Sequence, residues 1–428
     1  MRVSLIYGLL LLVLLGCSSK SSRKNFALSY WSSNNSSEIE FSKKIVDKWN
    51  TDNPDKKVHF QPVPEGQSSE EIILAAVVGK TTADIYANMW QGSVEFYAKS
   101  GVLVALDTLK GFMPFIYERC DSITINEITS NDGHIYQIPW KTNPIMTLYN
   151  KNILDTLGLD SLPITYSAFI DAAKNFILDT DGDGHIDQWF GITSVKPIWY
   201  QRLFNYYPLY LAASNGKSLI QGNKAAFNNE YSLQVFSFLQ ELYNNEYFSR
   251  QQQSAVSDQF IAGAVAIKFT GPWEINYLNK FMDKDTEFGF FNMPVPDNHQ
   301  GHYYTYGDPK NIVIFKTCKN PQLAWNFIKT MVSREGDYSF MEITEQLPRR
   351  KGMDTLPEYV SFFKHHPKLN VFAKQAKYVK GIDNCEKITE VLDIISQEYE
   401  ACVLYNKKTP KQALDDAEKA VNILLRVK

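Results

Sequence analysis

The sequence predicts an α/β fold with a largely parallel sheet, because strand-like and helical segments alternate at the start of the chain. The expected strands cover residues 26–31, 57–63 and 83–87. The helices between them begin at Ser37 and Ser68, each followed three residues later by a glutamate, which is the capping-box pattern. Ligands of such sheets bind beyond the carboxyl ends of the strands. Here those ends carry Ser32, Ser33, Asn34, Glu65, Gly66, Asn88 and Trp90.

Three later helices have clear start signals. Thr165 precedes an apolar helical pattern, and Asn320 and Thr409 each precede a proline, which is favoured at the first helical position. No repeat of fixed period and no long Gly-, Pro- or Ser-rich linker divides the chain after residue 25. The 428 residues suggest two or three domains, which we expect to be joined by short crossings.

The composition is that of a soluble globular protein, with 44% hydrophobic and 21% charged residues and a net charge of −3. Long disorder is disfavoured because the hydrophobic content is ordinary and the net charge is small. A nucleic-acid-binding protein is disfavoured because the chain has no basic excess. Cys120, Cys318, Cys385 and Cys402 are too few for a disulfide framework, and their three possible pairings stay open.

The first 16 residues are expected to form a signal peptide. The apolar run of residues 9–15 is shorter than the roughly 20 residues that a membrane-spanning helix needs. Leu14–Cys17 resembles the lipobox of bacterial lipoproteins. We therefore expect an exported lipoprotein of the cell envelope, with Cys17 lipidated and residues 17–25 serving as lipid anchor and flexible tether. A plain signal peptide and a buried first strand are the alternatives.

An aspartate-rich segment resembles the first part of an EF-hand loop. Its carboxylates recur at alternate positions, which lets them point toward one Ca²⁺ ion in a tight turn. The expected ligands are Asp179, Asp181, Asp183, Asp187, the backbone carbonyl of His185 and the amide of Gln188. Phe190 replaces the usual glutamate at position 12, so a solvated acidic turn is the alternative. We expect a structural ion, because nothing nearby suggests an activated water.

Sequence motifs of common enzymes are largely missing. The chain has no GxSxG, HExxH, GxxxxGK[ST] or GxGxxG motif, although a glycosidase can carry its two carboxylates without a local pattern. Aromatic side chains are more informative, because Trp31, Trp90, Trp140 and Trp273 lie at or near predicted strand ends or turns. Their flat apolar faces suit the CH faces of sugar rings, and packing within a core is the alternative.

Four segments resemble the extracellular solute-binding proteins of family 1, the sugar-receptor family of ABC importers to which maltose-binding protein belongs. They are residues 133–151 with Ile138-Pro139-Trp140, residues 157–165, residues 260–273 ending in Gly271-Pro272-Trp273, and residues 306–328. The resemblance runs from about residue 27 to 425. One small departure is Ala83-Asp84, which stands where Pro-Asp is common.

The resemblance implies two α/β lobes joined by three hinge crossings, with the ligand in the cleft between the lobes. One lobe would combine residues 26–140 with 269–309, and the other residues 141–268 with 310–428. The lobes would close on the ligand by hinge motion, and the closed monomer would dock on a membrane permease served by an ATPase. The implied function is capture of a sugar or oligosaccharide for import, without enzymatic activity.

The candidate ligand-binding residues come from two sources. The resemblance implies Trp273 as a sugar platform, together with Trp140, Lys141, Asp308 and Arg349, and the strand ends add Ser32, Asn34, Glu65 and Trp90. One alternative is a non-sugar solute, such as a peptide, polyamine or phosphate ester, bound through Lys141 and Arg349. The other alternative is a secreted carbohydrate-active enzyme.

Overall fold

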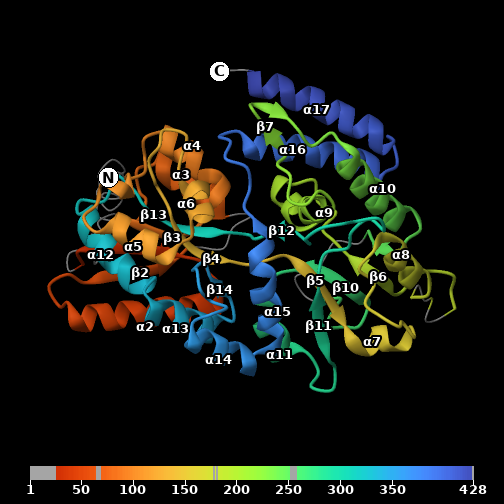
Figure 1. Cartoon of the computed structure of the whole chain (residues 1–428), viewed down its shortest axis with the longest axis horizontal. Helices are drawn as coiled ribbons and strands as arrows, with labels where there is room; N and C mark the ends of the chain where they lie inside the picture. Colours follow the sequence, from red (N-terminus) through yellow and green to blue (C-terminus); the bar gives the residue numbers. More distant parts are fainter. Residues whose placement is uncertain (1–25, 64–68, 177–178, 180–181, 251–257, 427–428) are drawn as a thin grey trace, which may run out of the picture.

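The computed structural model describes residues 26–63, 69–176, 179, 182–250 and 258–426. Two lobes lie side by side, each built on its own β-sheet with helices packed against it (Figure 1). The predicted functional residues Cys17, Glu65 and Asp181 lie outside the described residues.

The first lobe contains a six-stranded sheet. Its strands are β1 (Leu28–Ser32), β2 (Val58–Pro62), β3 (Ile85–Trp90), β4 (Ile138–Thr142), β13 (Lys310–Ile314) and β14 (Leu347–Pro348). Their order across the sheet is β14-β4-β13-β3-β1-β2. β1 pairs in parallel with β2 and β3, as the alternation of strand and helix predicts. β13 comes from late in the chain and inserts antiparallel between β3 and β4.

The second lobe contains a five-stranded sheet of order β11-β5-β10-β6-β9. These strands are β5 (Met146–Asn150), β6 (Trp189–Ile192), β9 (Phe248–Ser249), β10 (Val265–Thr270) and β11 (Phe288–Phe291). β6 is parallel to β9 and β10, and β5 is antiparallel to β10 and β11. Two short ladders join β7 (Ile220–Gln221) to β8 (Lys224–Ala225) and β12 (Thr305–Tyr306) to β15 (Val379–Lys380).

Helices cover both sheets (Figure 1). Those of the first lobe are α2 (Ser36–Asp52), α3 (Ser69–Val78), α4 (Gln91–Lys99), η2 (Leu106–Thr108), α5 (Phe112–Arg119), α6 (Ser122–Ile128), α12 (Pro321–Met331) and α13 (Arg334–Thr344). Those of the second lobe are α7 (Lys151–Thr156), α8 (Tyr166–Lys174), η3 (Trp199–Phe204), α9 (Tyr206–Ala213), α10 (Glu230–Asn244), α11 (Trp273–Phe281), α16 (Ile388–Tyr399), η5 (Glu400–Leu404) and α17 (Pro410–Arg426). Between them run α14 (Pro357–His365), α15 (Pro367–Gln375) and η4 (Ala376–Tyr378).

Most helix starts follow the local sequence signals. The side-chain oxygens of Thr165, Asn320 and Thr409 each accept a hydrogen bond from a backbone N–H in the first turn of α8, α12 and α17. The first helix differs from the prediction, because Asn35 rather than Ser37 caps α2. Asparagine and serine are both good N-caps, so the sequence alone does not choose between two such residues close together.

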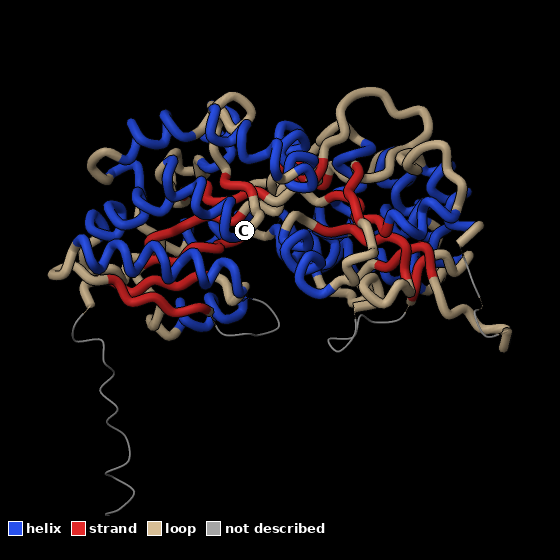
Figure 2. The backbone as a smooth tube through the Cα atoms, turned by 90° about the horizontal axis from the view of Figure 1, so that it is seen from below, coloured by secondary structure: helices blue, strands red, loops and turns tan. Residues whose placement is uncertain are grey.

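The predicted division of the chain between the lobes is wrong for two segments. Residues 269–309 largely belong to the second lobe, because β10 and β11 both pair with β5. Residues 310–348 return to the first lobe, because β13 and β14 pair with β4. The chain therefore crosses near residues 143–145 and 307–309, and a third time after β14. Figure 2 shows the two sheets apart, with the connecting segments gathered at the upper middle. Strand pairing over such separations has no local sequence signal.

Each lobe has its own apolar core, and a third cluster ties the lobes together. Trp140, Trp325 and Phe340 lie in the core of the first lobe. The shared cluster combines Leu347 of the first lobe with Phe290 of the second lobe and with side chains of α14 and α15. Packing therefore holds the lobes together on the side of the molecule where α15 runs.

Candidate functional site

The two lobes meet through two tryptophans. Trp90 ends β3 of the first lobe, and Trp199 begins η3, which follows β6 of the second lobe. Their ring centroids are 4.5 Å apart, with the planes tilted by 39°. Both residues follow the carboxyl ends of parallel strands, where ligands of such sheets bind. The contact therefore marks the candidate site between the lobes.

A chain of polar contacts fixes the position of Trp90. Its indole Nε1 donates a hydrogen bond of 2.9 Å to the hydroxyl of Tyr306, which lies on the second crossing. That hydroxyl in turn donates to Asp308 at 3.4 Å, and the Lys310 ammonium lies 3.2 Å from the same carboxylate. Burial raises the pKa of Asp308, and the nearby Lys310 and Lys141 partly oppose this shift. Trp90 is thus joined directly to the chain segment that crosses between the lobes near residues 307–309.

The second lobe supplies a small cavity of about 270 Å³ beside this contact. It is lined by β6, η3, β10 and the start of α11. The Trp273 ring borders the cavity, edge-on to Phe204 with ring centroids 6.2 Å apart. The Trp273 ring folds back over Gly271, where any Cβ would collide with it. This turn therefore requires a glycine at position 271 as long as the Trp273 ring keeps its place.

Polar groups complete the cavity. Asn205 is 1% exposed, and its Nδ2 has no hydrogen-bond partner among the described residues. Lys268 lies between two carboxylates, 3.0 Å from Asp258 and 2.6 Å from Glu274. Thr270 donates a hydrogen bond of 3.0 Å to the second oxygen of Glu274. Both carboxylates are held by protein donors, which leaves this cluster with a net charge of −1, and an amide donor remains beside two aromatic rings. Such a wall suits an uncharged ligand with hydroxyl groups.

Buried charges also lie at the crossing end of the first-lobe sheet. The ammonium of Lys141 contacts the carboxylate of Glu38, and both side chains are 4% exposed. The Gln346 amide donates to the same carboxylate at 2.8 Å. Burial lowers the pKa of Lys141, and the Glu38 carboxylate partly opposes that shift. This pair is buried within the protein and gives the cleft no free charge.

The structure brings some of the predicted ligand-binding residues together and separates others. Trp90 and Asp308 belong to one network, and Trp273 lines the neighbouring cavity. Ser32 is buried at the end of β1, and Asn34 is exposed just before α2.

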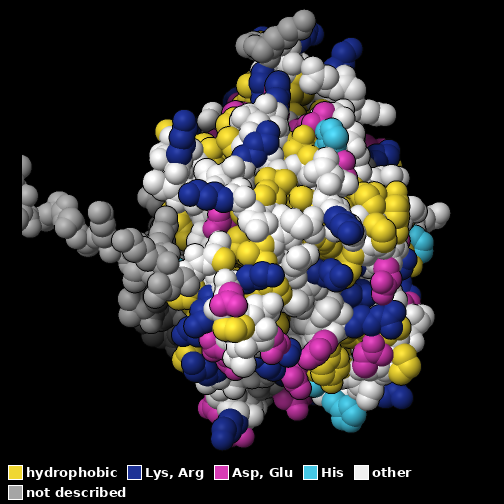
Figure 3. All heavy atoms as spheres, turned by 90° about the vertical axis from the view of Figure 1, so that its left-hand side faces the viewer, with side chains coloured by type: hydrophobic (Ala, Val, Ile, Leu, Met, Phe, Trp, Pro, Cys, Tyr) yellow, Lys and Arg dark blue, Asp and Glu magenta, His cyan; other side chains and the backbone are white. Residues whose placement is uncertain are grey.

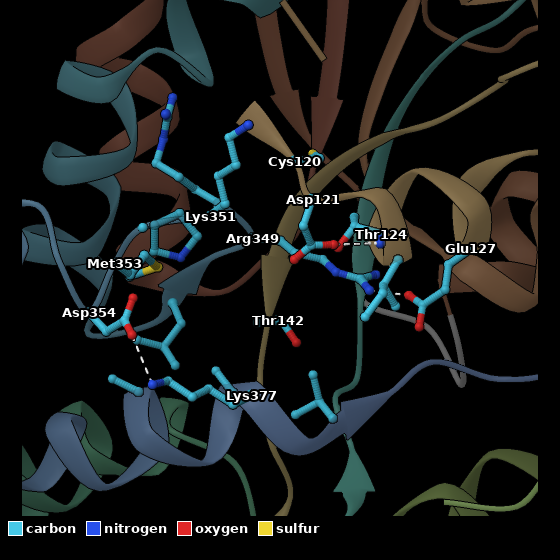
Figure 4. Close-up of a pocket in the computed structure, with 18 residues that line it drawn as sticks. Cys120, Asp121, Thr124, Glu127, Thr142, Arg349, Lys351, Met353, Asp354 and Lys377 are labelled. Atoms are coloured by element: carbon cyan, nitrogen blue, oxygen red, sulfur yellow. Dashed lines mark hydrogen bonds and ion pairs between the residues drawn. The ribbon is translucent and has the colours of Figure 1, made fainter. Parts of the chain in front are cut away.

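Two of the residues implied by the resemblance lie elsewhere. Trp140 and Trp90 are both 1% exposed, but Trp90 contacts the other lobe, whereas Trp140 packs against Phe340 inside the first-lobe core with ring centroids 5.1 Å apart. The core packing contradicts the prediction of a ligand contact for the Trp140 ring. Successive side chains of a strand point to opposite faces, and Trp140 occupies the core-facing position of β4. Arg349 lies in a separate cavity of about 260 Å³, bordered by α6, the turn after β14 and α15. There it is paired with Glu127 (Figure 4).

The structure also identifies site residues that the sequence analysis missed. Trp199, Phe204 and Asn205 lie at or near the site, and Tyr306 anchors Trp90. A signal was available, because residues 198–207 are unusually rich in aromatic side chains and directly follow a strand and its loop. That run alone does not show which of its rings face the core.

The carboxylates of Asp179 and Asp183 in the aspartate-rich loop accept hydrogen bonds from backbone amides of the same loop. The two carboxylate oxygens of Asp179 accept hydrogen bonds of 2.7 Å from the amides of Gly182 and Gly184. The carboxylate of Asp183 accepts from the amide of His185 at 2.8 Å. No group of three or more His, Cys, Asp or Glu side chains is placed to hold a metal ion within the described ranges, which omit Asp181. The Ca²⁺ site, including Asp187 and Gln188, stays a prediction.

Two further expectations concern the whole chain. Cys120, Cys318, Cys385 and Cys402 are all free thiols in this structure. In the part of the chain that the structure describes, no helix is both long enough and apolar enough to cross a membrane.

Known proteins resemble this chain in sequence. A family model described as bacterial extracellular solute-binding protein matches residues 35–338. A maltotriose-binding protein of Pyrococcus abyssi is 22% identical over 70% of this chain and 61% of its own length. The maltodextrin-binding protein MdxE of Bacillus subtilis is 22% identical over 51% of this chain and 50% of its own length. The chain thus matches only about half to three-fifths of each of these relatives.

Solved structures resemble the whole fold. An uncharacterized protein of Listeria monocytogenes, 24% identical, has a TM-score of 0.77 over 93% of this chain and 99% of its own. The cyclic alpha-maltosyl-1,6-maltose binding protein of Arthrobacter globiformis, 19% identical, has a TM-score of 0.75 over 94% and 99%. The fold is therefore the two-lobed fold of the maltose-binding type. The relatives with a named role are binding proteins, not enzymes. By its matching family model, the chain belongs to the bacterial extracellular solute-binding proteins.

Proposed function

We propose that this protein is the carbohydrate receptor of an ABC importer. The observation that carries the proposal is the aromatic site between the lobes, where Trp90 meets Trp199 beside the cavity bordered by Trp273. Aromatic faces with a few well-placed polar groups suit a neutral sugar, whose CH faces stack while its hydroxyls bind donors and acceptors.

Each lobe has a distinct part in this mechanism. In the second lobe, the Trp273 ring is the stacking platform, and Asn205 with Gln201 offers amide groups to sugar hydroxyls. In the first lobe, Trp90 closes against Trp199 when the lobes approach. The crossings near residues 143–145 and 307–309 act as the hinge, so ligand binding favours the closed state.

The relatives narrow the choice of sugars to test first. The two sequence relatives and one of the similar structures are named for maltotriose, maltodextrin and cyclic alpha-maltosyl-1,6-maltose. We therefore propose an α-glucan oligosaccharide as the first class of ligand. A charged solute is less well supported, because Lys141 and Arg349, the cations expected to bind it, are paired with Glu38 and Glu127.

Two further parts of the proposal concern export and metal binding. Lipidation of Cys17 anchors the receptor to the cell envelope, and a permease with its ATPase takes the ligand from the closed form. The support is the lipobox-like Leu14–Cys17, together with the extracellular family that the chain belongs to. The loop from Asp179 to Gln188 holds one structural Ca²⁺ ion, supported by its EF-hand-like spacing.

A thermal-shift screen of the mature chain against mono- and oligosaccharides tests the sugar proposal. A ligand at about 1,000 times its Kd stabilises the folded state by roughly 4 kcal/mol, which raises the melting temperature by several degrees. We expect one related group of glucans to give this shift. A response to charged solutes or peptides alone would contradict the proposal.

The variant Trp273→Ala, measured with the sugars found in that screen, tests whether the ligand binds at the Trp273 ring. We expect the variant to lose at least about fivefold in affinity, because a stacked aromatic platform is worth roughly 1–3 kcal/mol. Tyr277→Ala is the matched control, since Tyr277 is an exposed aromatic residue on the same helix, α11. Equal affinities for both variants would place the ligand elsewhere.

A further inference from the structure

One end of the first-lobe sheet carries a group of exposed lysines, which we call the basic end. They are Lys56, Lys57, Lys80, Lys110, Lys316 and Lys319. No ion pair of the described residues involves any of them. Figure 3 faces this side of the molecule and shows Lys and Arg side chains spread over it.

Hydrogen bonds show that these lysines share one end of the sheet. Where β1 and β2 begin, the amide of Ala27 donates to the carbonyl of Lys57 at 2.8 Å. The start of β3 meets the end of β13, where the hydroxyls of Thr82 and Thr317 are 2.8 Å apart. Lys316 and Lys319 flank Thr317, and Lys80 lies two residues before Thr82.

Lys110 lies at the same end of the sheet, next to the start of helix α12. Its amide donates to the side chain of Gln322, in the first turn of α12, at 3.0 Å. α12 begins directly after Lys319 and Asn320. The six lysines therefore surround the end of the sheet that lies away from the crossings.

The acidic groups near this end are largely held by other partners. Asp52 lies 3.1 Å from Lys48, and Asp84 accepts the amide and hydroxyl of Ser29 at 2.7 Å. At the flank, Asp107 lies 2.9 Å from the ring of His134, and Asp132 accepts from the Tyr136 hydroxyl at 2.7 Å. Asp55 adds one exposed carboxylate. The six lysines together with Lys48 outnumber these five aspartates, so this end carries a small positive excess, although the whole chain has a net charge of −3.

The chain enters the fold at this same end. The first described residue, Phe26, is 37% exposed, and its ring packs near His59 with centroids 5.0 Å apart. The sequence just before it carries three more cations, Lys20, Arg23 and Lys24. A lipid on Cys17 is joined to the basic end by nine residues at most, a reach of about 30 Å when fully extended.

We propose that the basic end rests on the anionic phospholipid headgroups of the membrane that holds the lipid anchor. The proposal depends on the export and anchoring proposed above. Basic residues next to a membrane anchor are attracted to anionic lipid, and one chain of lipid combined with a basic patch binds more firmly than the lipid alone. The end of β1–β3 that carries Ser32 and Trp90 then points away from the bilayer, toward arriving ligand.

Vesicle sedimentation tests this contact without the anchor. The mature chain from Ser18 onward is mixed with vesicles of phosphatidylglycerol and phosphatidylcholine, and with vesicles of phosphatidylcholine alone. We expect binding to the anionic vesicles that weakens as salt rises, because salt screens exposed charges. Each lysine near an anionic surface strengthens binding roughly fivefold, so replacing Lys56, Lys57, Lys316 and Lys319 by Gln should weaken it at least about tenfold.

A matched variant distinguishes the effect of the basic end on vesicle binding from the effect of the net charge of the protein. Lys224, Lys284, Lys364 and Lys419 are exposed lysines outside the basic end, and their replacement by Gln changes the net charge equally. Equal losses in the two variants would overturn the proposal. So would equal binding to neutral vesicles, no binding to either vesicle, or binding to single-stranded DNA alone.

The receptor function is measured separately on the same variants. Sugar-induced thermal shifts show whether each variant is folded and binds ligand, and lipidation of Cys17 is measured on the native protein. If the sugar proposal or the anchor proposal fails, the vesicle experiment still shows whether the basic end binds anionic lipid.

Discussion

Trp90 and Trp199 belong to different lobes, and their ring centroids lie 4.5 Å apart. Trp90 is also hydrogen-bonded to Tyr306, so this contact links the facing surfaces of the two lobes to a segment that crosses between them. A contact made between lobes favours the closed form and is lost when the lobes separate.

Trp199→Ala should shift the protein toward the open form. An aromatic pair contributes about 0.5–1.5 kcal/mol, so ligand affinity should fall roughly two- to tenfold. Isothermal titration measures the affinity, and small-angle scattering of the ligand-free protein measures the expansion. Tyr405→Ala removes an exposed aromatic residue from the second lobe and is the control. Unchanged affinity and unchanged scattering would contradict a role in closure.

Lys141→Met should destabilise the protein strongly. The substitution leaves the Glu38 carboxylate buried without its cation, which costs about 3–5 kcal/mol of unfolding free energy. Urea denaturation followed by circular dichroism measures this loss. The double variant Lys141→Met with Glu38→Gln should recover a large part of it, because no buried charge then remains. A single variant as stable as the native protein would show that the pair is not buried in solution.

Ca²⁺ should raise the melting temperature of protein pretreated with EDTA. Saturation at about 1,000 times the Kd contributes roughly 4 kcal/mol, or several degrees. Asp179→Asn with Asp183→Asn should abolish the rise, whereas Asp155→Asn with Asp160→Asn, at exposed aspartates outside the loop, should retain it. The same melting temperature with EDTA and with Ca²⁺ would leave the loop as a solvated acidic turn.

Cys17→Ala should release the protein from the membrane fraction of cells. This thiol is the proposed site of the lipid, and the described part of the chain has no helix that could span a bilayer. Cell fractionation measures the release, and mass spectrometry of the N-terminal peptide detects the lipid. Cys385→Ala keeps Cys17 and should remain membrane-bound. Release of both variants, or an unmodified Cys17 in the native protein, would refute lipid anchoring.

The resemblance to a family implies site residues that the structure places in different surroundings. Trp273 lines the cavity beside η3, where its ring lies over Gly271, and its contact with a sugar stays a prediction. The resemblance implies that Trp140 lies at the ligand, but the residue lies in the core, because a short apolar strand does not show which of its faces is buried. Arg349 lies in another cavity, since its position depends on where β14 joins the sheet.

The sequence by itself determined the order of β1, β2 and β3 with their helices, and the caps at Thr165 and Asn320. These features depend on backbone and side-chain preferences that act within a few residues. Only the tertiary structure decided which lobe contains β10 and β13, and that Trp90 bonds to Tyr306, 216 residues later. Such contacts depend on the packing of whole sheets, and that packing cannot be predicted from any short stretch of sequence.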